Sequence, residues 1–344
     1  MALRWGILGA GKICHDFVVG LKTLPASEHT VVAIAARSAD SAQQFAATHS
    51  IPRSYGTYDD LMKDSGVDVV YIGTIHVTHL GIAMKVLEAG KPVLCEKPMT
   101  MNPQDTKTMI DKAREKSLFL MEGTWMCFFP AIVEMRRMIA EGDIGEVRFI
   151  RANFSFRMPT EVLETKGRHI DPELGGGSVL ALGTYPISFA TMIFGGERPE
   201  KIYAQGTLLS TGVDGTAVIT LTYSGGRIAQ LCCSISFDMA CDAVVCGTKG
   251  ELRLPPPFWC PTKLELPKGV YKKDSVSKEF PLPEPYLPTN FLNSTGLHYE
   301  AEEVYKCIKG GKKESSVMPL EQSLIVAEIA EEIMKQIGVI YYKK

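Results

Sequence analysis

Residues 3–14, Leu-Arg-Trp-Gly-Ile-Leu-Gly-Ala-Gly-Lys-Ile-Cys, decide the fold class of this chain. An apolar strand leads into a glycine turn, and a helix is predicted over 12–24. Gly9 and Gly11 match the first two glycines of the G-x-G-x-x-G loop, and Cys14 takes the place of the third. The glycines permit a tight turn and let the backbone approach a pyrophosphate at the helix N-terminus, whereas an ordinary glycine turn is the alternative. We expect a dinucleotide to contact Gly9, Ala10, Gly11, Lys12 and Ile13.

Strand and helix patterns alternate through the first third of the chain. Unbroken apolar runs at 30–36 and 67–74 are typical of buried strands, and further strands are predicted at 92–96 and 118–122. Strands that alternate with helices at this spacing imply a parallel, doubly wound sheet. We therefore predict an α/β fold in which residues 1–128 form a Rossmann domain.

After about residue 130 long strands dominate. Gly225-Gly226 predicts a hairpin between two of them. A helix is predicted near 178–194, and the proline-rich stretch 255–288 is predicted to be irregular surface. We expect residues 129–344 to form an α+β domain with a large open, mostly antiparallel sheet, and the C-terminal helices, at 299–308 and 320–337, to pack back on the first domain.

The composition narrows the classes of partner. The formal net charge is -2 with 22% charged residues, which argues against a nucleic-acid or anionic-membrane partner. No stretch resembles a secretory signal or the roughly 20 apolar residues of a membrane helix, so we expect a cytoplasmic protein. The nine cysteines include no C-x-x-C pair, so we expect no metal site and buried, reduced thiols.

The end of the second predicted strand bears on the choice of dinucleotide. A binder of NAD usually places Asp or Glu here, to hold the ribose 2′-hydroxyl. This chain has Arg37 and then Ser38. A guanidinium and a hydroxyl donor suit a 2′-phosphate, so the sequence predicts NADP; a surface arginine at a strand end is the alternative.

Residues 94–98, Leu-Cys-Glu-Lys-Pro, resemble the Glu-Lys-Pro signature of the glucose–fructose oxidoreductase and inositol dehydrogenase family. Segments 1–6, 35–37, 119–122, 247–250 and 299–301 support the resemblance, which covers nearly the whole chain. It implies a two-domain NADP-dependent oxidoreductase of sugars or cyclic diols, and a homodimer formed through the open sheet. It places Lys97 in the active site and implies that Glu96, Thr74, His76 and His79 contact the cofactor; for the two histidines, polar surface residues remain the alternative.

Residues 175–185 contain the second implied catalytic position. Family members usually carry an Asp and, four residues later, a Tyr or His on one helical face. Tyr185 matches the aromatic position, but Ala181 stands where the Asp is usual. Cys127 and Gly215 likewise replace a common Arg and Asp.

These residues suggest hydride transfer with Tyr185 as general acid/base, and with Lys97 lowering the pKa of Tyr185 or steadying the oxyanion. Trp125 and Phe154 are expected to wall the substrate pocket, or else belong to the core, and Arg148 is expected at substrate, cofactor, partner or solvent. Loss of the Asp at Ala181 leaves a catalytically weakened cofactor-binding relative as the alternative. A lyase or glycosidase that recycles its cofactor is a further one.

Overall fold

The computed structural model describes residues 2–159, 161–162, 167–268 and 274–341. These residues form two compact units. The first comprises 1–100, 104–125 and 282–320, and the second comprises 101–103, 126–281 and 321–344. A continuous boundary near residue 128 therefore does not describe the units, because the chain returns to the first unit after residue 281.

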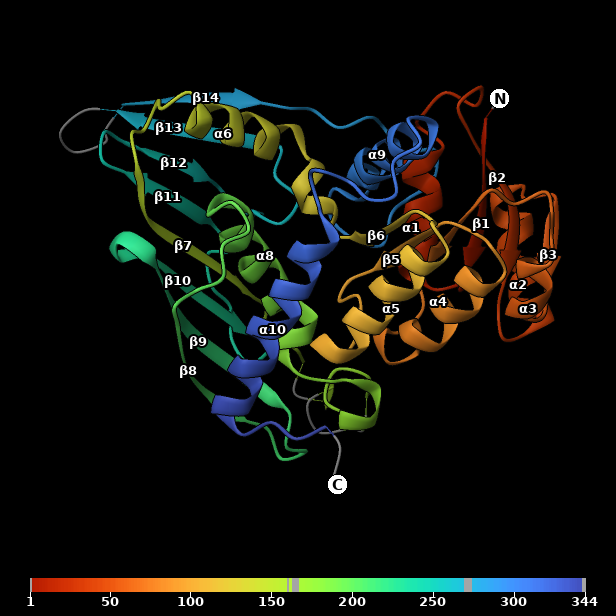
Figure 1. Cartoon of the computed structure of the whole chain (residues 1–344), viewed down its shortest axis with the longest axis horizontal. Helices are drawn as coiled ribbons and strands as arrows, with labels where there is room; N and C mark the ends of the chain where they lie inside the picture. The colour runs from red at the N-terminus through yellow and green to blue at the C-terminus, as the bar shows by residue number, and fades with distance from the viewer. Residues whose placement is uncertain (1, 160, 163–166, 269–273, 342–344) are drawn as a thin grey trace. The chain divides into compact units, whose positions relative to one another are not determined.

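The first unit is built on a six-stranded parallel sheet in the order β3-β2-β1-β4-β5-β6 (Figure 1). This is the strand order of a Rossmann fold, so the predicted doubly wound sheet is confirmed. Its strands are β1 Leu3–Leu8, β2 His29–Ala35, β3 Arg53–Tyr55, β4 Val69–Ile72, β5 Val93–Glu96 and β6 Leu120–Gly123. Its helices are α1 Lys12–Leu21, α2 Ala39–His49, α3 Tyr58–Met62, η1 His76–Thr78, α4 His79–Glu88, α5 Pro103–Glu115, η6 Ser294–Gly296 and α9 Leu297–Lys309.

The returning segment packs on α1. Both η6 and α9 contact α1, and a Cβ on Gly20 would lie only 3.1 Å from the Thr295 carbonyl oxygen. Asp16, a fully buried residue of α1, accepts hydrogen bonds from the backbone N–H groups of Asn290 and Phe291 at 2.8 Å. These contacts hold the returning segment, and with it α9, against α1 of the first unit.

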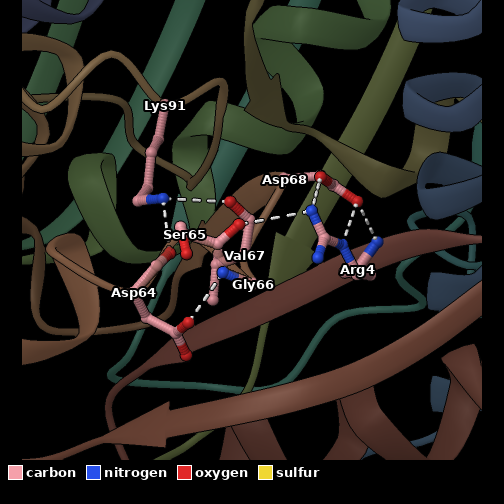
Figure 2. A network of polar contacts seen from close by, with 7 residues as sticks. All are labelled: Arg4, Asp64, Ser65, Gly66, Val67, Asp68 and Lys91. Carbon is pink, nitrogen blue, oxygen red and sulfur yellow. Dashed lines mark hydrogen bonds and ion pairs between the residues drawn. The ribbon is translucent and has the colours of Figure 1, made fainter.

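The amino ends of the strands are held by a polar network, drawn in Figure 2. The Arg4 guanidinium donates to both oxygens of Asp68, at 2.9 and 2.7 Å, just before β4 begins. Lys91, which is 8% exposed, donates to the carbonyl oxygens of Asp64 and Val67 at 2.8 and 3.0 Å. This network stabilises the edge of the sheet opposite the glycine loop.

The second unit contains an eight-stranded sheet in the order β14-β13-β12-β11-β7-β10-β9-β8. Among the described strands of this sheet only β7 and β10 pair in parallel, so the predicted open, mostly antiparallel sheet is confirmed. The predicted hairpin joins β9 to β10. The strands are β7 Val147–Ser155, β8 Lys201–Leu208, β9 Asp214–Tyr223, β10 Arg227–Ser234, β11 Ala243–Gly247, β12 Glu251–Leu254, β13 Lys263–Lys268 and β14 Asp274–Glu279.

Helices cover one face of this sheet. Figure 1 shows α6 Pro130–Ala140, α8 Thr184–Ile193 and α10 Leu320–Ile337 on that side. Helix α8 packs on β7 and β10, and Gln336 of α10 bonds to the backbone of β8. On β9 and β10 the residues toward the helices are buried, whereas alternate residues are exposed.

The proline-rich stretch 255–288 was predicted to be irregular, and this was wrong. It contains β13 and β14, which extend the sheet at one edge. Every residue of β14 whose burial is described is exposed, so this strand is held by main-chain pairing rather than by a buried face. Such a strand lacks the apolar alternation that a sequence pattern can detect.

One described helical stretch, Pro172–Ile193, is long and apolar enough by composition alone to cross a membrane, with a mean hydropathy of 1.2. Sequence reasoning did not single out this stretch. Its most apolar window is 89% buried within the fold. That burial is typical of a core helix, which needs an apolar surface on all sides.

Candidate active site

The glycine loop between β1 and α1 has the geometry of a phosphate cradle. Gly9 has a φ of +112°, a backbone conformation that residues with a side chain rarely adopt. Gly11 is the N-cap of α1, and no side chain caps its N–H groups. A Cβ on Gly11 would meet nothing within 4 Å. The loop thus presents unblocked backbone donors and open space at a helix N-terminus, which suits an anion.

Cys14 is fully buried and fits the position of the missing third glycine. Its thiol donates to the carbonyl oxygen of Gly73 at 3.3 Å, at the end of β4. A Cβ on Gly9 would lie 3.2 Å from the Cys14 sulfur. Burial raises the pKa of Cys14 to about 12, so the thiol stays neutral. The substitution tightens helix–strand packing and leaves the phosphate side of the loop open.

Arg37 and Ser38 lie where β2 passes into α2. Ser38 is the N-cap of α2, and its hydroxyl accepts from the Ser41 N–H at 3.4 Å. Arg37 is exposed, and its charge acts on Tyr58 of α3, where burial raises the hydroxyl pKa and the arginine opposes the rise. Tyr58 lines a pocket together with Val77 and Gly81. The exposed guanidinium therefore lies by a hollow in the first unit.

His79 ties two loops together at the carboxyl edge of the sheet. Its Nδ1 lies 3.0 Å from the Pro98 carbonyl oxygen, and its Nε2 lies 3.1 Å from that of Thr74. His79 is 1% exposed and the neighbouring His76 is 7% exposed, so neither is a polar surface residue. The sequence identified these histidines as candidates, and the structure gives His79 a bridging position beside Lys97-Pro98.

Glu96 is held by two donors at the end of β5. The Tyr71 hydroxyl donates to Glu96 Oε1 at 2.7 Å, and the Lys97 backbone N–H lies 3.2 Å from Oε2. Tyr71 is fully buried and stacks on Phe17 of α1, with ring centroids 3.8 Å apart. The Glu96 carboxylate consequently fixes the point at which the chain turns toward Lys97.

In the second unit, Tyr185 lies near the start of α8, directly after a π-helical turn, Val179–Gly183. The helix predicted near 178–194 is present, but its first turn, which carries Ala181, is π-helical and the remainder is α-helical. π-Helical turns are rare and occur frequently at functional sites. Tyr185 is 7% exposed, so the residue is largely buried.

Asp214 anchors that turn, and sequence reasoning missed it. Its Oδ2 accepts from the Ser178 hydroxyl at 2.6 Å and from the Val179 N–H at 2.7 Å. Burial raises the pKa of Asp214 to about 6, against the effect of these two donors. The segment 212–215 drew notice only for Gly215, although the neighbouring carboxyl is the one that holds the helix start.

An aromatic cluster surrounds Tyr185. Phe154 of β7 lies 5.5 Å from the Tyr185 ring, in an edge-on arrangement. Trp259 stacks on Phe154 with centroids 3.8 Å apart and an interplanar angle of 11°. Trp259 was missed because it lies in the stretch predicted to be irregular. The cluster offers aromatic faces next to a phenolic hydroxyl, which suits an apolar ring.

Trp125 and Arg148, two further residues expected in the substrate pocket, lie on different elements. Trp125 is 5% exposed and begins the 3-10 helix η2 Trp125–Phe128, in which Cys127 is fully buried. Arg148 is half exposed on β7 and is bonded to Glu146 and to the Gly225 carbonyl oxygen. These contacts give Arg148 partners at the sheet surface.

One described cluster, Glu28, His29 and Glu302, brings metal-type ligands together. The Trp5 indole N–H lies 3.4 Å from His29 Nδ1, so Nε2 carries the ring proton of the neutral histidine. That nitrogen faces Glu302 at 3.4 Å as a donor and not as a metal ligand. The geometry thus favours a hydrogen-bonded histidine.

Comparison with known proteins agrees with this architecture. Residues 3–124 match the oxidoreductase family with an NAD-binding Rossmann fold, and residues 132–253 match the GFO/IDH/MocA C-terminal domain. The chain belongs to this oxidoreductase family, and the resemblance stated from residues 94–98 is confirmed.

Within the family, the chain is similar to trans-1,2-dihydrobenzene-1,2-diol dehydrogenases. It is 46% identical to that of Danio rerio and 45% identical to that of Homo sapiens, over 99% of this chain and 98% of each relative. Among solved structures, a levoglucosan dehydrogenase in complex with NADH and levoglucosan has a TM-score of 0.84 at 19% identity, covering 98% of this chain and 97% of the other. A 3-ketoreductase from Actinomadura kijaniata in complex with NADP has a TM-score of 0.82 at 23% identity, covering 98% of each chain.

Proposed function

We propose that this protein is an NADP(H)-dependent oxidoreductase that acts on a CH–OH group of a cyclic trans-diol or a sugar. The proposal rests on the 45–46% sequence identity to dihydrodiol dehydrogenases, which extends over 99% of this chain. The aromatic cluster of Phe154, Tyr185 and Trp259 adds support, because stacked rings beside a proton-exchanging hydroxyl suit a cyclic diol.

The residues of the first unit fit a dinucleotide. Gly9 and Gly11 leave a cradle with no side chain in it, and the uncapped start of α1 would hold a pyrophosphate. Arg37 supports NADP over NAD because a guanidinium pairs well with a 2′-phosphate. The N-terminus of α2, capped by Ser38, also favours a negatively charged group through the helix dipole. The solved relatives bind NADP in one case and NADH in the other, so this residue decides the proposed preference.

A bound nicotinamide supplies the hydride acceptor or donor. Tyr185, which is largely buried, exchanges the proton of the substrate hydroxyl as general acid/base. The Lys97 ammonium stabilises the developing charge on the substrate oxygen. Ala181 cannot hydrogen-bond substrate, so the enzyme relies on Tyr185, Lys97 and aromatic packing for its grip.

The test is NADP⁺ reduction with a cyclic trans-diol, D-xylose and other aldoses. Lys97→Met and Tyr185→Phe are each expected to lower kcat at least a hundredfold, as loss of a general acid/base group does. Lys63→Met is the control, because the Lys63 side chain is 77% exposed on the same unit. Unchanged turnover in Lys97→Met would refute the assigned role. NADPH binding without turnover on any substrate, with rescue by Ala181→Asp, would favour the weakened relative.

Arg37→Glu tests the cofactor preference. We expect the Kd for NADPH to rise at least thirtyfold, since a charge-assisted bond to phosphate becomes a repulsion, whereas the Kd for NADH changes less than threefold. Equal losses for both dinucleotides would contradict the role of Arg37.

The proposal extends to a cytoplasmic homodimer. All nine cysteines are free, which suits a reducing compartment. One face of the second sheet exposes Tyr203, Val218 and Ile228 at 56%, 48% and 37%, and exposed apolar side chains on a sheet face suit an association site. Val218→Lys is expected to yield monomers in light scattering, and Val133→Lys, on an exposed helical position, is the control. A dimer that persists in Val218→Lys would argue against this face.

A further inference from the structure

A buried carboxyl group lies behind the Glu96–Lys97 junction, and the reaction as described does not use it. Glu300 is on α9, and its side chain is 0% exposed. Both carboxyl oxygens are shielded from solvent and have no hydrogen-bond partner among the described residues. An ionised carboxylate in this state is among the most costly arrangements a fold can hold. The group therefore calls for a specific explanation.

Glu300 lies next to Gly123, at the carboxyl ends of β5 and β6. A Cβ on Gly123 would lie 3.6 Å from Glu300 Oε2 and 3.4 Å from the Cα of Glu96. Gly123 is the register partner of Glu96 in the β5–β6 pair. The Glu300 carboxyl consequently occupies space next to the strand end that precedes Lys97.

Titratable groups of β4 and β5 interact with Glu300. Glu96 of β5 carries a charge of the same sign as an ionised Glu300 and raises the pKa of Glu300. A charge on Glu300 in turn raises the pKa of Tyr71 on β4. Cys14 of α1 interacts with both Tyr71 and Glu96. Burial, and then the Glu96 charge, raise the pKa of Glu300 well above its ordinary value. Burial also raises the pKa of Tyr71 and Cys14, so neither becomes charged near neutral pH.

We propose that Glu300 is a positioning residue for Lys97: its carboxyl stays neutral and packs behind the Glu96 carboxylate without repelling it. Glu96 then keeps the Tyr71 hydroxyl and the Lys97 backbone N–H as its donors. A charged Glu300 would place two carboxylates together, draw Glu96 away from these donors and displace Lys97. The inference rests on the proposed role of Lys97, and deepens it by naming what sets the position of that residue.

The protonation state is tested by unfolding between pH 5 and 9. An acid whose pKa is raised on folding contributes stability below its unfolded pKa and loses it as pH rises toward the folded pKa. Glu300→Gln is permanently neutral, so the ratio of its unfolding constant to that of the wild type should fall up to tenfold per pH unit. Glu303→Gln, on the same helix with a carboxylate bonded to Ser315, should parallel the wild type. Parallel curves for Glu300→Gln and wild type would overturn the proposal.

The positioning role is tested by NADPH affinity and by kcat at pH 7. Glu300→Gln should keep both within threefold, because it reproduces the neutral form. Glu300→Ala, or Glu300→Met if the first does not fold, should lower kcat or NADPH affinity at least tenfold, because the support behind Glu96 is lost. A purely structural Glu300 would change the unfolding midpoint alone, and that result would overturn the positioning role. If the wild type turns over no diol or sugar, the proposed function fails, while the pH dependence and NADPH affinity still decide the role of Glu300.

Discussion

Gly177→Ala is expected to destabilise the second unit strongly. Gly177 has a φ of +115°, and a Cβ there would overlap Asp214 Oδ1 and lie 3.0 Å from the Tyr341 hydroxyl oxygen. The backbone conformation alone costs a non-glycine residue about 1–3 kcal/mol. Asp214 must also move, which weakens its bonds from Ser178 and Val179; each bond to a charged acceptor is worth about 1.5–3 kcal/mol. Loss of one bond brings the expected cost to about 2.5–6 kcal/mol.

Gly142→Ala is the matched control for the backbone contribution. Gly142 belongs to the same unit and has a φ of +79°, but a Cβ there would meet nothing within 4 Å. Its expected cost is about 1–2 kcal/mol, from the left-handed backbone alone. Urea unfolding followed by tryptophan fluorescence measures the difference, provided that the transitions by fluorescence and circular dichroism coincide.

A double-mutant cycle locates the source of the penalty. In an Asp214→Ala background the overlapping oxygen is gone, so Gly177→Ala should cost about as much as Gly142→Ala. Equal losses for Gly177→Ala and Gly142→Ala in the wild-type background would refute the reasoning. So would additive losses for Gly177→Ala and Asp214→Ala, because the overlap would then contribute nothing.

Three further predictions concern pH, the sheet edge and the aromatic cluster. Folding raises the pKa of Asp214 from 3.8 to about 6, so its contribution to the free energy of unfolding is present below pH ~4 and lost by pH ~6. The wild type should therefore lose about 3 kcal/mol of stability over this range in unfolding curves, and Asp214→Asn should not. Lys91→Met leaves two carbonyl groups without their donor and should cost about 2 kcal/mol in urea unfolding, while the NADPH Kd stays within twofold because Lys91 lies at the amino edge. Trp259→Ala removes the stack on Phe154 and should raise KM for a cyclic diol about tenfold with an unchanged NADPH Kd, measured by steady-state kinetics and fluorescence titration. A loss of NADPH affinity in either of the last two variants would contradict these assignments.

The sequence predicted those parts of the fold that depend on local pattern. The helix expected at 320–337 begins and ends at the residues observed for α10, and the glycine loop lies between β1 and α1 as expected. Both carry a local signal: an apolar period in the helix and a φ requirement at Gly9. The failure at β13 and β14 has the opposite cause, because pairing with a neighbouring strand, rather than an apolar face, stabilises them.

The candidate site divides in the same way. Lys97 and Tyr185 could be nominated from motifs, whereas the groups that support their surroundings could not. Glu300 and Asp214 read as ordinary surface acids, on an amphipathic helix and beside a turn glycine. Their burial arises from contacts with residues far away in the chain, Gly123 for Glu300 and Ser178 for Asp214. A carboxyl group that the structure buries cannot be distinguished in sequence from one that it leaves in water.

The two buried acids give the protein a pH dependence whose parts can be separated. Folding raises the pKa of both, so each makes the protein less stable as pH increases, which is the reverse of the usual ion-paired carboxylate. The effect of Asp214 ends by about pH 6, whereas burial and then the Glu96 charge hold the pKa of Glu300 well above its ordinary value. Between pH 6.5 and 8, Asp214→Asn should therefore run parallel to the wild type while Glu300→Gln diverges from it. Each acid titrates among partners of its own unit, so the two effects should add in the double variant.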